Sequence, residues 1–588
     1  MKLFKKFLAA AMIPLVMGVG AVKTAPEQAT AAKDKNNDDW LTTNGNKIVD
    51  MNGNEVWLTG VNWFGFNTGS GVFDGVWMYS MREGLKTIAD CGFNILRVPM
   101  PAELLLNWRD GKKDTRTPMV DFERNPELQN NYIWNDPVDG SNHPNWTNPQ
   151  LKTSMEIFDI AMEMCKEYGL KVMVDIHSAE IDAVGHQQPV WYTGKISTKD
   201  YYESLEWLTA KFKNDDTLIA IDLKNEPHGK ATDPHMARWD NSTHPDNWKL
   251  VAETAGKKVL DINPNMLILI EGTEVYPKFE NGADWNSQTG GYGSPPNYHG
   301  TWWGGNFRGV KEFPADFGSA KYNKQIVYSP HDYGPAVWEQ DWFKSSFTKE
   351  SLYNDCWRDN WMFIHENNIA PLLIGEWGGW LMNDLDERGP ADKNTPKNEQ
   401  WMTYLREFMI ENRIHHTFWC FNANSSDTGG IMCDNFQKFN TPKYEFVKPA
   451  LWQTKDGKFI GLDHEVPIGK NGISLNEYVK GSGGNTNPTT ATAEATTKAT
   501  TTETVTELTT VKSGVRYGDV NCDGEVTIDD VVKLRLYLLN GASYPLDDDA
   551  IANSKVIVGQ SSIQGNCAVT IQDFVVEKIK TLPIVLQS

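Results

Sequence analysis

Short apolar runs alternate with longer amphipathic stretches from Trp40 to about Trp452. Brief apolar runs bounded by turn residues are typical of buried strands, whereas the amphipathic stretches have the spacing of surface helices. Several helical stretches end in a glycine, as at Gly92 and Gly169, which is a common helix terminator. Repeated β-α units of this kind predict an α/β fold, a (β/α)8 TIM barrel over residues 40–455. The eight expected strands are Val56–Asn62, Phe93–Val98, Lys171–His177, Leu218–Lys224, Met266–Glu271, Gln325–His331, Pro371–Glu376 and His415–Trp419.

The expected strands end in polar or aromatic residues. In a (β/α)8 barrel the carboxyl ends of the strands meet at one face, and that face carries the active site. Buried polar groups are costly unless they are paired, so a purely structural barrel has no reason to gather them there. The residues concerned are Asn62, Trp63, Arg97, His177, Asn225, Glu226, Glu271, His331, Tyr333, Glu376 and Trp419.

Two of these residues, Glu226 and Glu376, form a candidate catalytic pair. Paired carboxyl groups suit glycoside hydrolysis, in which one donates a proton to the leaving oxygen and the other attacks the anomeric carbon. The acid must stay protonated near neutral pH, whereas the nucleophile must stay ionised. We expect Arg97 to keep Glu376 anionic, and His331 and Tyr333 to hydrogen-bond it.

The order of these residues resembles glycoside hydrolase family five, once called cellulase family A. The resemblance covers about Trp40 to Trp452 and implies a retaining enzyme with Glu226 as acid/base and Glu376 as nucleophile. It implies that the other members bind or orient the substrate. The family's recurring set is matched in order by Arg97, His177, Asn225, Glu226, His331, Tyr333, Glu376 and Trp419.

Three stretches resemble the endoglucanases of this family, which act on β-1,4-glucans such as cellulose: Thr59–Phe66, Trp302–Phe307 and Ser329–Tyr333. Trp63, Trp302 and Trp303 are candidate sugar platforms, because aromatic rings stack on the apolar faces of sugars, with core packing as the alternative for each. Another β-glycanase of the family, a mannanase or xyloglucanase, is the alternative activity. A non-catalytic carbohydrate-binding scaffold component is the alternative of another class.

Composition narrows the class of protein further. Residues 1–31 begin with a basic segment and continue into an apolar stretch, the pattern of a secretory signal peptide. No later apolar run reaches the roughly 20 residues of a membrane span. The net charge of −21 argues against a nucleic-acid partner, because phosphates are bound by clustered Lys and Arg. No spacing typical of metal ligands occurs in the barrel, so we expect no cofactor in catalysis. The seven cysteines leave disulfide pairing open.

Residues 481–512 are rich in Thr and contain almost no large apolar residue before Val505. Such a segment cannot bury enough surface to offset its ordering entropy, so we expect a flexible linker. Residues 515–583 contain an internal repeat, in which Val526–Val532 recurs as Val569–Val575. A repeat on this scale indicates duplicated supersecondary units that bury their faces against each other.

The first copy of the repeat fits a twelve-residue calcium loop, with oxygen ligands at alternate positions and Gly524 at the turn. The aligned second loop has less negative charge and no glycine at that position, so we expect weaker calcium binding there, or none. The expected ligands of the first loop are Asp519, Asn521, Asp523, Glu525 through its carbonyl, Thr527 directly or through a water, and Asp530.

Duplicated calcium loops after a Thr-rich linker resemble a dockerin, a small all-α module that binds cohesin domains of a scaffold protein in bacterial cellulosomes. The resemblance covers about Tyr517 to Leu582. It implies structural Ca²⁺ and a cohesin partner contacted through Ile528, Asp529, Ile571 and Gln572. With the signal peptide, it implies a secreted, extracellular enzyme held on a cellulosome at the cell surface.

Overall fold

The chain separates into two compact units, Met1–Asn487 and Pro488–Ser588. The signal segment and nearly all of the linker expected from the sequence lie outside the described residues. The computed structural model describes residues 37–112, 114, 116, 118–130, 151–181, 186–287, 297–481, 516–522, 526–540, 545–546, 548–556, 567 and 571.

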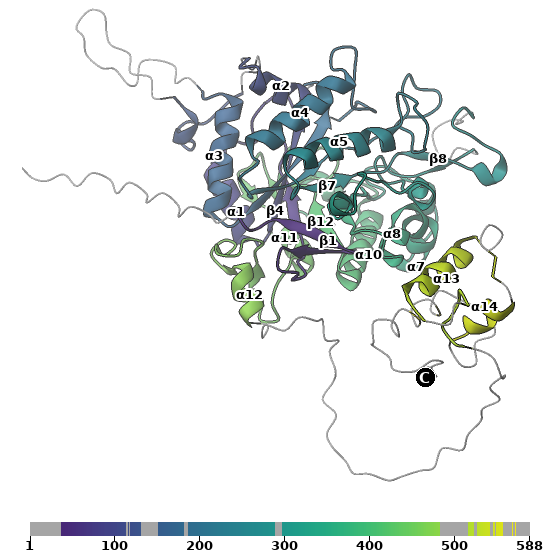
Figure 1. The fold of residues 1–588 in the computed structure, drawn as a ribbon. Helices are drawn as coiled ribbons and strands as arrows, with labels where there is room; N and C mark the ends of the chain where they lie inside the picture. The colour runs from purple at the N-terminus through teal and green to yellow at the C-terminus, as the bar shows by residue number, and fades with distance from the viewer. Residues whose placement is uncertain are drawn as a thin grey trace, which may run out of the picture. The chain divides into compact units, whose positions relative to one another are not determined.

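The first unit is built around an eight-stranded parallel sheet (Figure 1). Each strand overlaps one of the eight runs expected from the sequence, so the predicted (β/α)8 barrel is confirmed. The strands are β3 (Thr59–Asn62), β4 (Ile95–Pro101), β5 (Lys171–Ser178), β6 (Leu218–Asp222), β7 (Leu267–Ile270), β10 (Ile326–Tyr328), β11 (Leu373–Trp377) and β12 (His415–Phe418).

The sheet closes on itself. Its strand order is β10-β7-β6-β5-β4-β3-β12-β11, and every pairing is parallel. The two outer strands in that order, β10 and β11, meet through parallel bridges at Tyr328↔Leu372 and His331↔Glu376. Closure removes the free edges of the sheet. The second bridge also brings two predicted site residues to the same point of the rim.

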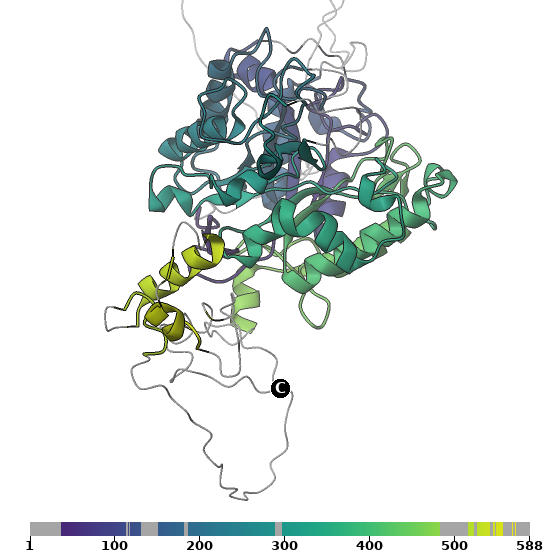
Figure 2. The same cartoon turned by 90° about the vertical axis from the view of Figure 1, so that its right-hand side faces the viewer.

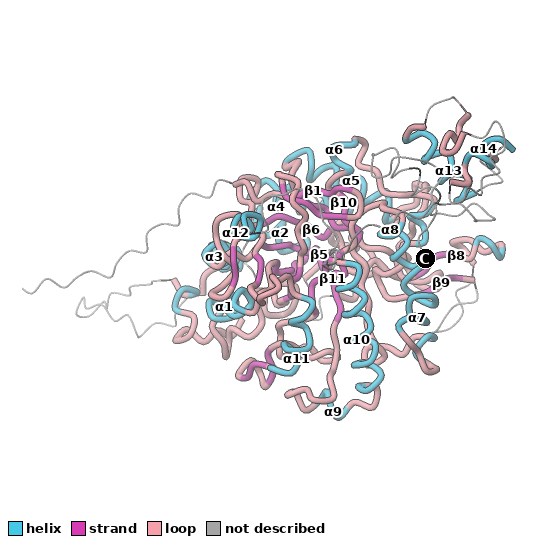
Figure 3. Tube along the Cα trace, turned by 90° about the horizontal axis from the view of Figure 1, so that it is seen from below, coloured by secondary structure: helices cyan, strands magenta, loops and turns pink. Residues whose placement is uncertain are grey.

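Helices surround the strands in the side views (Figure 1, Figure 2), and the strands gather at the centre in the view from below (Figure 3). A π-helical stretch, Tyr353–Met362, joins α7 to α8. The α-helices are α1 (Met81–Asp90), α2 (Ala102–Arg109), α3 (Ser154–Glu167), α4 (Thr198–Lys211), α5 (Trp248–Ile262), α6 (Ala320–Asn323), α7 (Lys349–Leu352), α8 (Phe363–Glu366), α9 (Arg388–Ala391), α10 (Thr395–Asn412), α11 (Thr441–Val447) and α12 (Leu475–Gly481).

Local sequence sets the ends of several helices. Thr153 and Glu156 form a reciprocal capping box at the start of α3, which satisfies two backbone N–H groups that lack helical partners. Gly92 and Gly169, which the sequence places after two helices, have φ values of +85° and +68°. Because this left-handed region is unfavourable for side chains with a Cβ, glycine ends the helix there at little cost.

Alternating strand residues build two layers inside the barrel. Ile95, Met173 and Leu267 belong to a buried apolar cluster near the amino ends of the strands. Two residues further along β4 and β5, Arg97 and Asp175 are also fully buried, so the interior changes from apolar to charged toward the carboxyl ends. This change separates the part of the barrel that is a packed core from the part that carries chemistry.

Segments from both ends of the first unit pack on the lower apolar layer. The antiparallel pair β1 (Leu41–Asn44) and β2 (Lys47–Asp50) contributes Leu41 and Ile48 to it. Ile460 and Leu475 contribute to it from beyond residue 455. The remaining short pairs are β8 (Val275–Pro277) with β9 (Tyr298–Gly300), β13 (Met432–Cys433) with β14 (Lys438–Phe439), and β15 (Phe459–Ile460) with β16 (Gly472–Ile473).

The second unit contains α13 (Ile528–Asn540) and α14 (Asp548–Asn553). The first of these begins within the last positions of the candidate calcium loop. A small apolar cluster lies under it, and Ile571 is fully buried in that cluster. The expectation that Ile571 contacts a partner is wrong for this conformation, because its side chain is used in packing. Among the described residues, no helix combines the length and apolar character that crossing a membrane requires.

A buried ion cluster fastens the ends of the first unit to the barrel. The Lys171 ammonium at the start of β5 contacts Asp39 and lies 3.4 Å from Asp216 and 3.5 Å from Asp463. His464 lies 2.6 Å from the Asp39 carboxylate. The side chains of Lys171 and its three acidic partners are almost wholly buried, so each charge depends on the others for compensation.

We expect Lys171→Met to lower the free energy of unfolding by about 3–5 kcal/mol, because it leaves buried carboxylates without their cation. Denaturant unfolding of the whole chain measures this loss. Lys213→Met, which removes the same charge from an exposed residue of the first unit, serves as control. A loss below about 1 kcal/mol for Lys171→Met would show that the cluster is not a major stabilising contact.

Candidate active site

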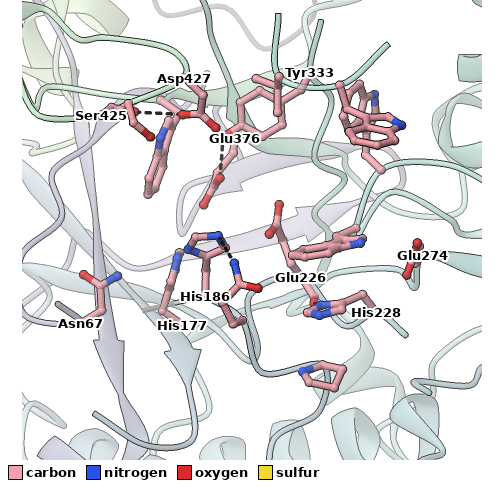
Figure 4. Close-up of a pocket in the computed structure, with 18 of the residues that line it drawn as sticks. Asn67, His177, His186, Glu226, His228, Glu274, Tyr333, Glu376, Ser425 and Asp427 are labelled. Carbon is pink, nitrogen blue, oxygen red and sulfur yellow. Dashed lines mark hydrogen bonds between the residues drawn. The ribbon is translucent and has the colours of Figure 1, made fainter. Parts of the chain in front are cut away.

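The carboxyl ends of the strands open into a cleft of about 1200 Å³ (Figure 4). Loops after six of the eight strands line it, together with Glu376 of β11. The structure brings all eight members of the predicted set to this place. His177, Glu226, Tyr333, Glu376 and Trp419 line the cleft, and Arg97, Asn225 and His331 are buried among them.

Glu376 lies where the register between β11 and β12 shifts, between Ile374 and Trp377. Such irregularities re-aim the side chains next to them. The Arg97 guanidinium donates through Nη1 to Oε1 of Glu376 at 2.8 Å, and the Tyr333 hydroxyl donates to Oε2 at 2.6 Å. Each oxygen of the carboxylate is therefore held by its own donor, as the sequence predicted for Arg97 and Tyr333. The hydrogen bond expected from His331 is not made to Glu376, because its Nδ1 lies 3.7 Å from that carboxylate and hydrogen-bonds Glu226 instead.

Glu226 follows β6 and has a φ of +48°, which is uncommon for a residue with a side chain. Its backbone N–H donates to Oε2 of Glu271 at 2.8 Å, and its carboxylate Oε1 lies 3.1 Å from Nδ1 of His331. Burial alone would raise the pKa of Glu226, but the hydrogen bond and charge of His331 lower it below the usual value. These contacts favour the ionised form of Glu226 in the ligand-free site, whereas the role expected from the sequence requires the protonated form.

His331 stands between three carboxylates. Its Nδ1 lies 3.1 Å from Glu226 and 3.7 Å from Glu376, and its Nε2 lies 3.2 Å from Oε1 of Glu271. Burial alone would lower the pKa of His331, but Glu271 and Glu376 raise it well above the usual value. The surroundings of His331 thus favour its protonated form.

The two candidate catalytic carboxylates lie close together. One oxygen of Glu226, one oxygen of Glu376 and a ring nitrogen of His331 all lie within 4.8 Å of one another. The surroundings of the two acids differ, because Glu376 accepts from a guanidinium and a phenol whereas Glu226 faces an imidazole.

Arg97 is the centre of a larger buried network. Besides Glu376, it contacts Asp222 at 2.9 Å, Asp175 at 3.3 Å and Glu271 at 3.3 Å. Burial raises the pKa of Asp175 to about 7 and that of Asp222 to about 6, against the opposing effect of Arg97. The Arg97 Nη2 also donates to Oδ1 of Asn225 at 3.1 Å. That bond fixes the amide next to Glu226.

His177 and Trp419 form one wall of the cleft. Their rings stack with centroids 5.9 Å apart, and Trp419 also stacks on Phe64 at 5.4 Å. His177 hydrogen-bonds Asp175, and its burial lowers its pKa well below the usual value. A neutral imidazole and a half-buried indole thus offer a hydrogen-bonding edge and an apolar face side by side.

The predicted sugar platforms divide into two groups. Trp63 is only 1% exposed and packs against Phe73 and Phe421, so its expected contact with sugar is wrong and core packing is its role. Trp302 and Trp303 do line the cleft. Trp303 stacks on His228 with centroids 3.7 Å apart, which leaves the other face of the indole available.

Several residues of the site carry no role in the sequence prediction. Glu271 stands among the expected strand-end residues but without a role, whereas Asp175 and Asp222 were not singled out. Both are buried in apolar strands, and a charged residue in such a run is the signal that would have found them. Trp338, which is 52% exposed, and Asp427 line the cleft from loops. Loop residues have no periodic pattern, so the sequence gives no comparable signal for these two.

This chain is similar to several known proteins. The family described as "Cellulase (glycosyl hydrolase family 5)" matches residues 49–425. Endoglucanase G of Acetivibrio thermocellus is 46% identical over 538 residues, covering 89% of each chain. Endoglucanase B of the same organism is 42% identical over 564 residues, covering 91% of this chain and 92% of the other.

Solved structures of other proteins are also similar to this chain. A cellotetraose complex of the endocellulase from Pyrococcus horikoshii is similar with a TM-score of 0.56 and 28% identity, covering 70% of this chain and 98% of the other. The catalytic domain of the major endoglucanase from Xanthomonas campestris pv. campestris is similar with a TM-score of 0.54 and 27% identity, covering 70% and 100%. Because the family match spans most of the barrel and includes both strand-end glutamates, this chain belongs to glycosyl hydrolase family 5, the cellulase family, and is a glycoside hydrolase.

Proposed function

We propose that this chain is a secreted endo-β-1,4-glucanase that hydrolyses internal bonds of cellulose and related β-glucans with retention of configuration. The observation that carries the proposal is the pair of carboxylates, Glu226 and Glu376, with nearest oxygens within 4.8 Å and unlike surroundings. Retaining enzymes separate the two groups by about 5–5.5 Å, whereas inverting enzymes need about 6.5–9.5 Å to admit a water.

In the first step a proton passes to the leaving oxygen and the nucleophile attacks. Glu226 receives the Nδ1 proton of His331 and donates it to the glycosidic oxygen as the bond from that oxygen to the anomeric carbon breaks. An oxygen of Glu376 bonds to the anomeric carbon from the opposite side. Arg97 and Tyr333 hold the Glu376 carboxylate in the position for this attack.

In the second step a water attacks the anomeric carbon of the glycosyl-enzyme. Glu226, now a carboxylate, takes a proton from that water, and the bond to Glu376 breaks. Asn225, held by Arg97, is placed next to Glu226 to hydrogen-bond the sugar 2-hydroxyl, a contact that strengthens in the transition state. The complete acid pair argues against the alternative of a non-catalytic scaffold component.

Action within the chain is supported by the dimensions of the cleft. Its volume of about 1200 Å³ exceeds that of a site for one or two sugar units. Aromatic side chains line it besides the acids, with Trp419 stacked on His177 and Trp303 stacked on His228. The relatives are named endoglucanases, which favours β-1,4-glucan over the mannan or xyloglucan of the alternative activities.

The second unit is proposed to be a dockerin-like module that binds Ca²⁺ and a cohesin domain. Asp519, Asn521, Thr527 and Asp530 supply oxygen donors of the kind that Ca²⁺ prefers. The buried Asp530 carboxylate accepts from the backbone N–H groups of Asn521 at 2.9 Å and Thr527 at 2.7 Å, which draws the two ends of the loop together. Asp523, Glu525 and Gln572 lie outside the described residues, as do the side chains of Ile528 and Asp529.

Removing either catalytic acid tests the roles. Glu376→Ala is expected to lower kcat on a soluble β-glucan roughly 10⁴-fold, and Glu226→Ala roughly 10²–10⁴-fold. With an aryl cellobioside and sodium azide, Glu376→Ala should form the α-glycosyl azide and Glu226→Ala the β-glycosyl azide, identified by NMR. The exposed Glu411→Ala is the control. The opposite pairing of anomers would reverse the assignment, and an inverted product from the unmodified enzyme would exclude retention.

Substrate class is tested by reducing-end release on carboxymethyl cellulose, mannan, xyloglucan and xylan. We expect the fastest release on carboxymethyl cellulose, with an early fall in viscosity because internal bonds are cut. A higher rate on mannan or xyloglucan would establish the alternative activity. A single short product without loss of viscosity would exclude internal cleavage.

Calcium titration of the metal-free whole chain, followed by calorimetry, tests the second unit. We expect one tight site per chain, abolished in Asp530→Ala and retained in Asp316→Ala, which removes an exposed acid of the first unit. Capture by a purified cohesin domain should require Ca²⁺. Two tight sites would contradict the expected weakness of the second loop, and absence of binding would exclude the calcium role.

A further inference from the structure

Glu271 follows β7 and is fully buried behind the cleft. It does not line the cleft, so it cannot touch the substrate. It does contact the backbone N–H of Glu226 and the ring of His331, which in turn hydrogen-bonds the Glu226 carboxylate. We propose that Glu271 is a positioning residue that fixes the backbone of Glu226 and the tautomer of His331, and thereby controls the proton delivered to the glycosidic oxygen. This inference rests on the proposed roles of Glu226 and Glu376.

The first contact fixes the backbone of the acid. Glu226 has a left-handed φ of +48°, a conformation that persists in a residue with a side chain only when the surroundings hold it. Oε2 of Glu271 accepts its backbone N–H at 2.8 Å. Glu271 is fully buried, so breaking this bond would leave a buried carboxylate oxygen without its donor.

The second contact fixes the imidazole. Oε1 of Glu271 lies 3.2 Å from Nε2 of His331, and Nδ1 of the same ring lies 3.1 Å from Oε1 of Glu226. The three groups form a line of carboxylate, imidazole and carboxylate. A carboxylate behind an imidazole holds the proton on the nitrogen that faces it, so the other nitrogen is the one that exchanges a proton with the reacting group.

The surrounding fold leaves room for Glu271 in this position. Gly304 has a φ of +72°, and a Cβ there would lie 2.1 Å from Oε2 of Glu271. The indole of Trp248 donates to the Glu271 backbone carbonyl at 2.8 Å, which fixes the end of β7. Both features place the carboxylate against Glu226 and His331.

One proton is relayed in each of the two steps. In the first step, the Nδ1 proton of His331 passes to Glu226 and on to the leaving oxygen. The bond from that oxygen to the anomeric carbon breaks, and the bond from the anomeric carbon to Glu376 forms. In the second, water attacks the anomeric carbon, its proton passes to Glu226 and back to Nδ1, and the bond to Glu376 breaks. Throughout, Nε2 keeps its proton, 3.2 Å from Oε1 of Glu271.

The sign of the pH effect follows from the charges around His331. Its raised pKa depends on the carboxylates beside it, with Glu271 the largest of their contributions. Burial raises the pKa of Glu271 itself well above the usual value, against the opposing charges of His331 and Arg97. In its ionised form Glu271 raises the pKa of His331, so its replacement lowers the pKa of the unit that supplies the proton, and activity is expected to be lost at lower pH than before. The titratable groups that face Glu271 and His331 are Arg97 on β4, Asp175 on β5, Asp222, Lys224 and Glu226 at the end of β6, and Glu376 on β11.

The test compares Glu271→Gln with the unmodified enzyme. The basic limb of the pH profile of kcat/KM on carboxymethyl cellulose should move down by roughly 1–3 pH units. At pH 7, kcat/KM on a cellobioside with a poor leaving group should fall roughly 10–100-fold. On 2,4-dinitrophenyl cellobioside, whose leaving group needs no proton, it should fall less than about 3-fold. That dependence on the leaving group distinguishes control of the proton from general structural damage.

Two further variants keep the result interpretable. Asp384→Asn removes a buried carboxylate that pairs with Lys443, away from Glu226, and should leave the pH profile and the leaving-group dependence unchanged. If Glu271→Gln does not fold, Glu271→Asp, which keeps the charge but shortens the reach, should give the same effects at smaller size. An unmoved basic limb, or equal losses on both leaving groups, in a folded variant would overturn the proposal. Lack of glucanase activity in the unmodified enzyme would instead overturn the proposed function.

Discussion

The Arg97 guanidinium is the contact on which the rest of the site depends. It is fully buried and lies within 3.3 Å of four carboxylates, on β5, β6 and β11 and directly after β7. Burying that many acids in one barrel would be prohibitive without a cation among them, because each charge loses its hydration. A guanidinium has five donors in a rigid fork, so it can compensate several carboxylates at once. A lysine at the same place offers neither the reach nor the geometry.

This arrangement separates the two catalytic acids chemically while keeping them close in space. Arg97 and Tyr333 bind one, and His331 binds the other. The Arg97 guanidinium contacts Glu376 directly. It reaches Glu226 indirectly, through the neighbouring Asn225 and through Glu271, which accepts from the Glu226 backbone. Two chemically identical side chains acquire different roles because their neighbours differ.

The barrel also divides stability from catalysis along its axis. At the amino ends of the strands an apolar layer and the ion cluster of Lys171 hold segments from both ends of the first unit. At the carboxyl ends, the interior is charged and opens into the cleft. Two residues along a strand separate Met173 in the apolar layer from Asp175 in the charged one. Substitutions in the cleft loops can therefore alter substrate preference without disturbing the core.

The sequence by itself determined the eight strands, the order of the family's catalytic set and the placement of each member at a strand end. It did so because strands and helices are periodic, and because a polar residue that ends an apolar run has little other reason to be there. The sequence alone did not show whether Trp63 faces the cleft or the core. Its side chain packs in the core, because the loop after a strand decides which way the first residue beyond that strand points.

Only the tertiary structure decided which partners each acid has. The contacts between Glu226, Glu271 and His331 join residues separated by 45 and 105 positions in the chain. Nothing in the local sequence distinguishes Glu271 from any other strand-end acid. Protonation depends on distances of a few ångströms between such groups, and those distances exist only once the barrel has closed through β10 and β11.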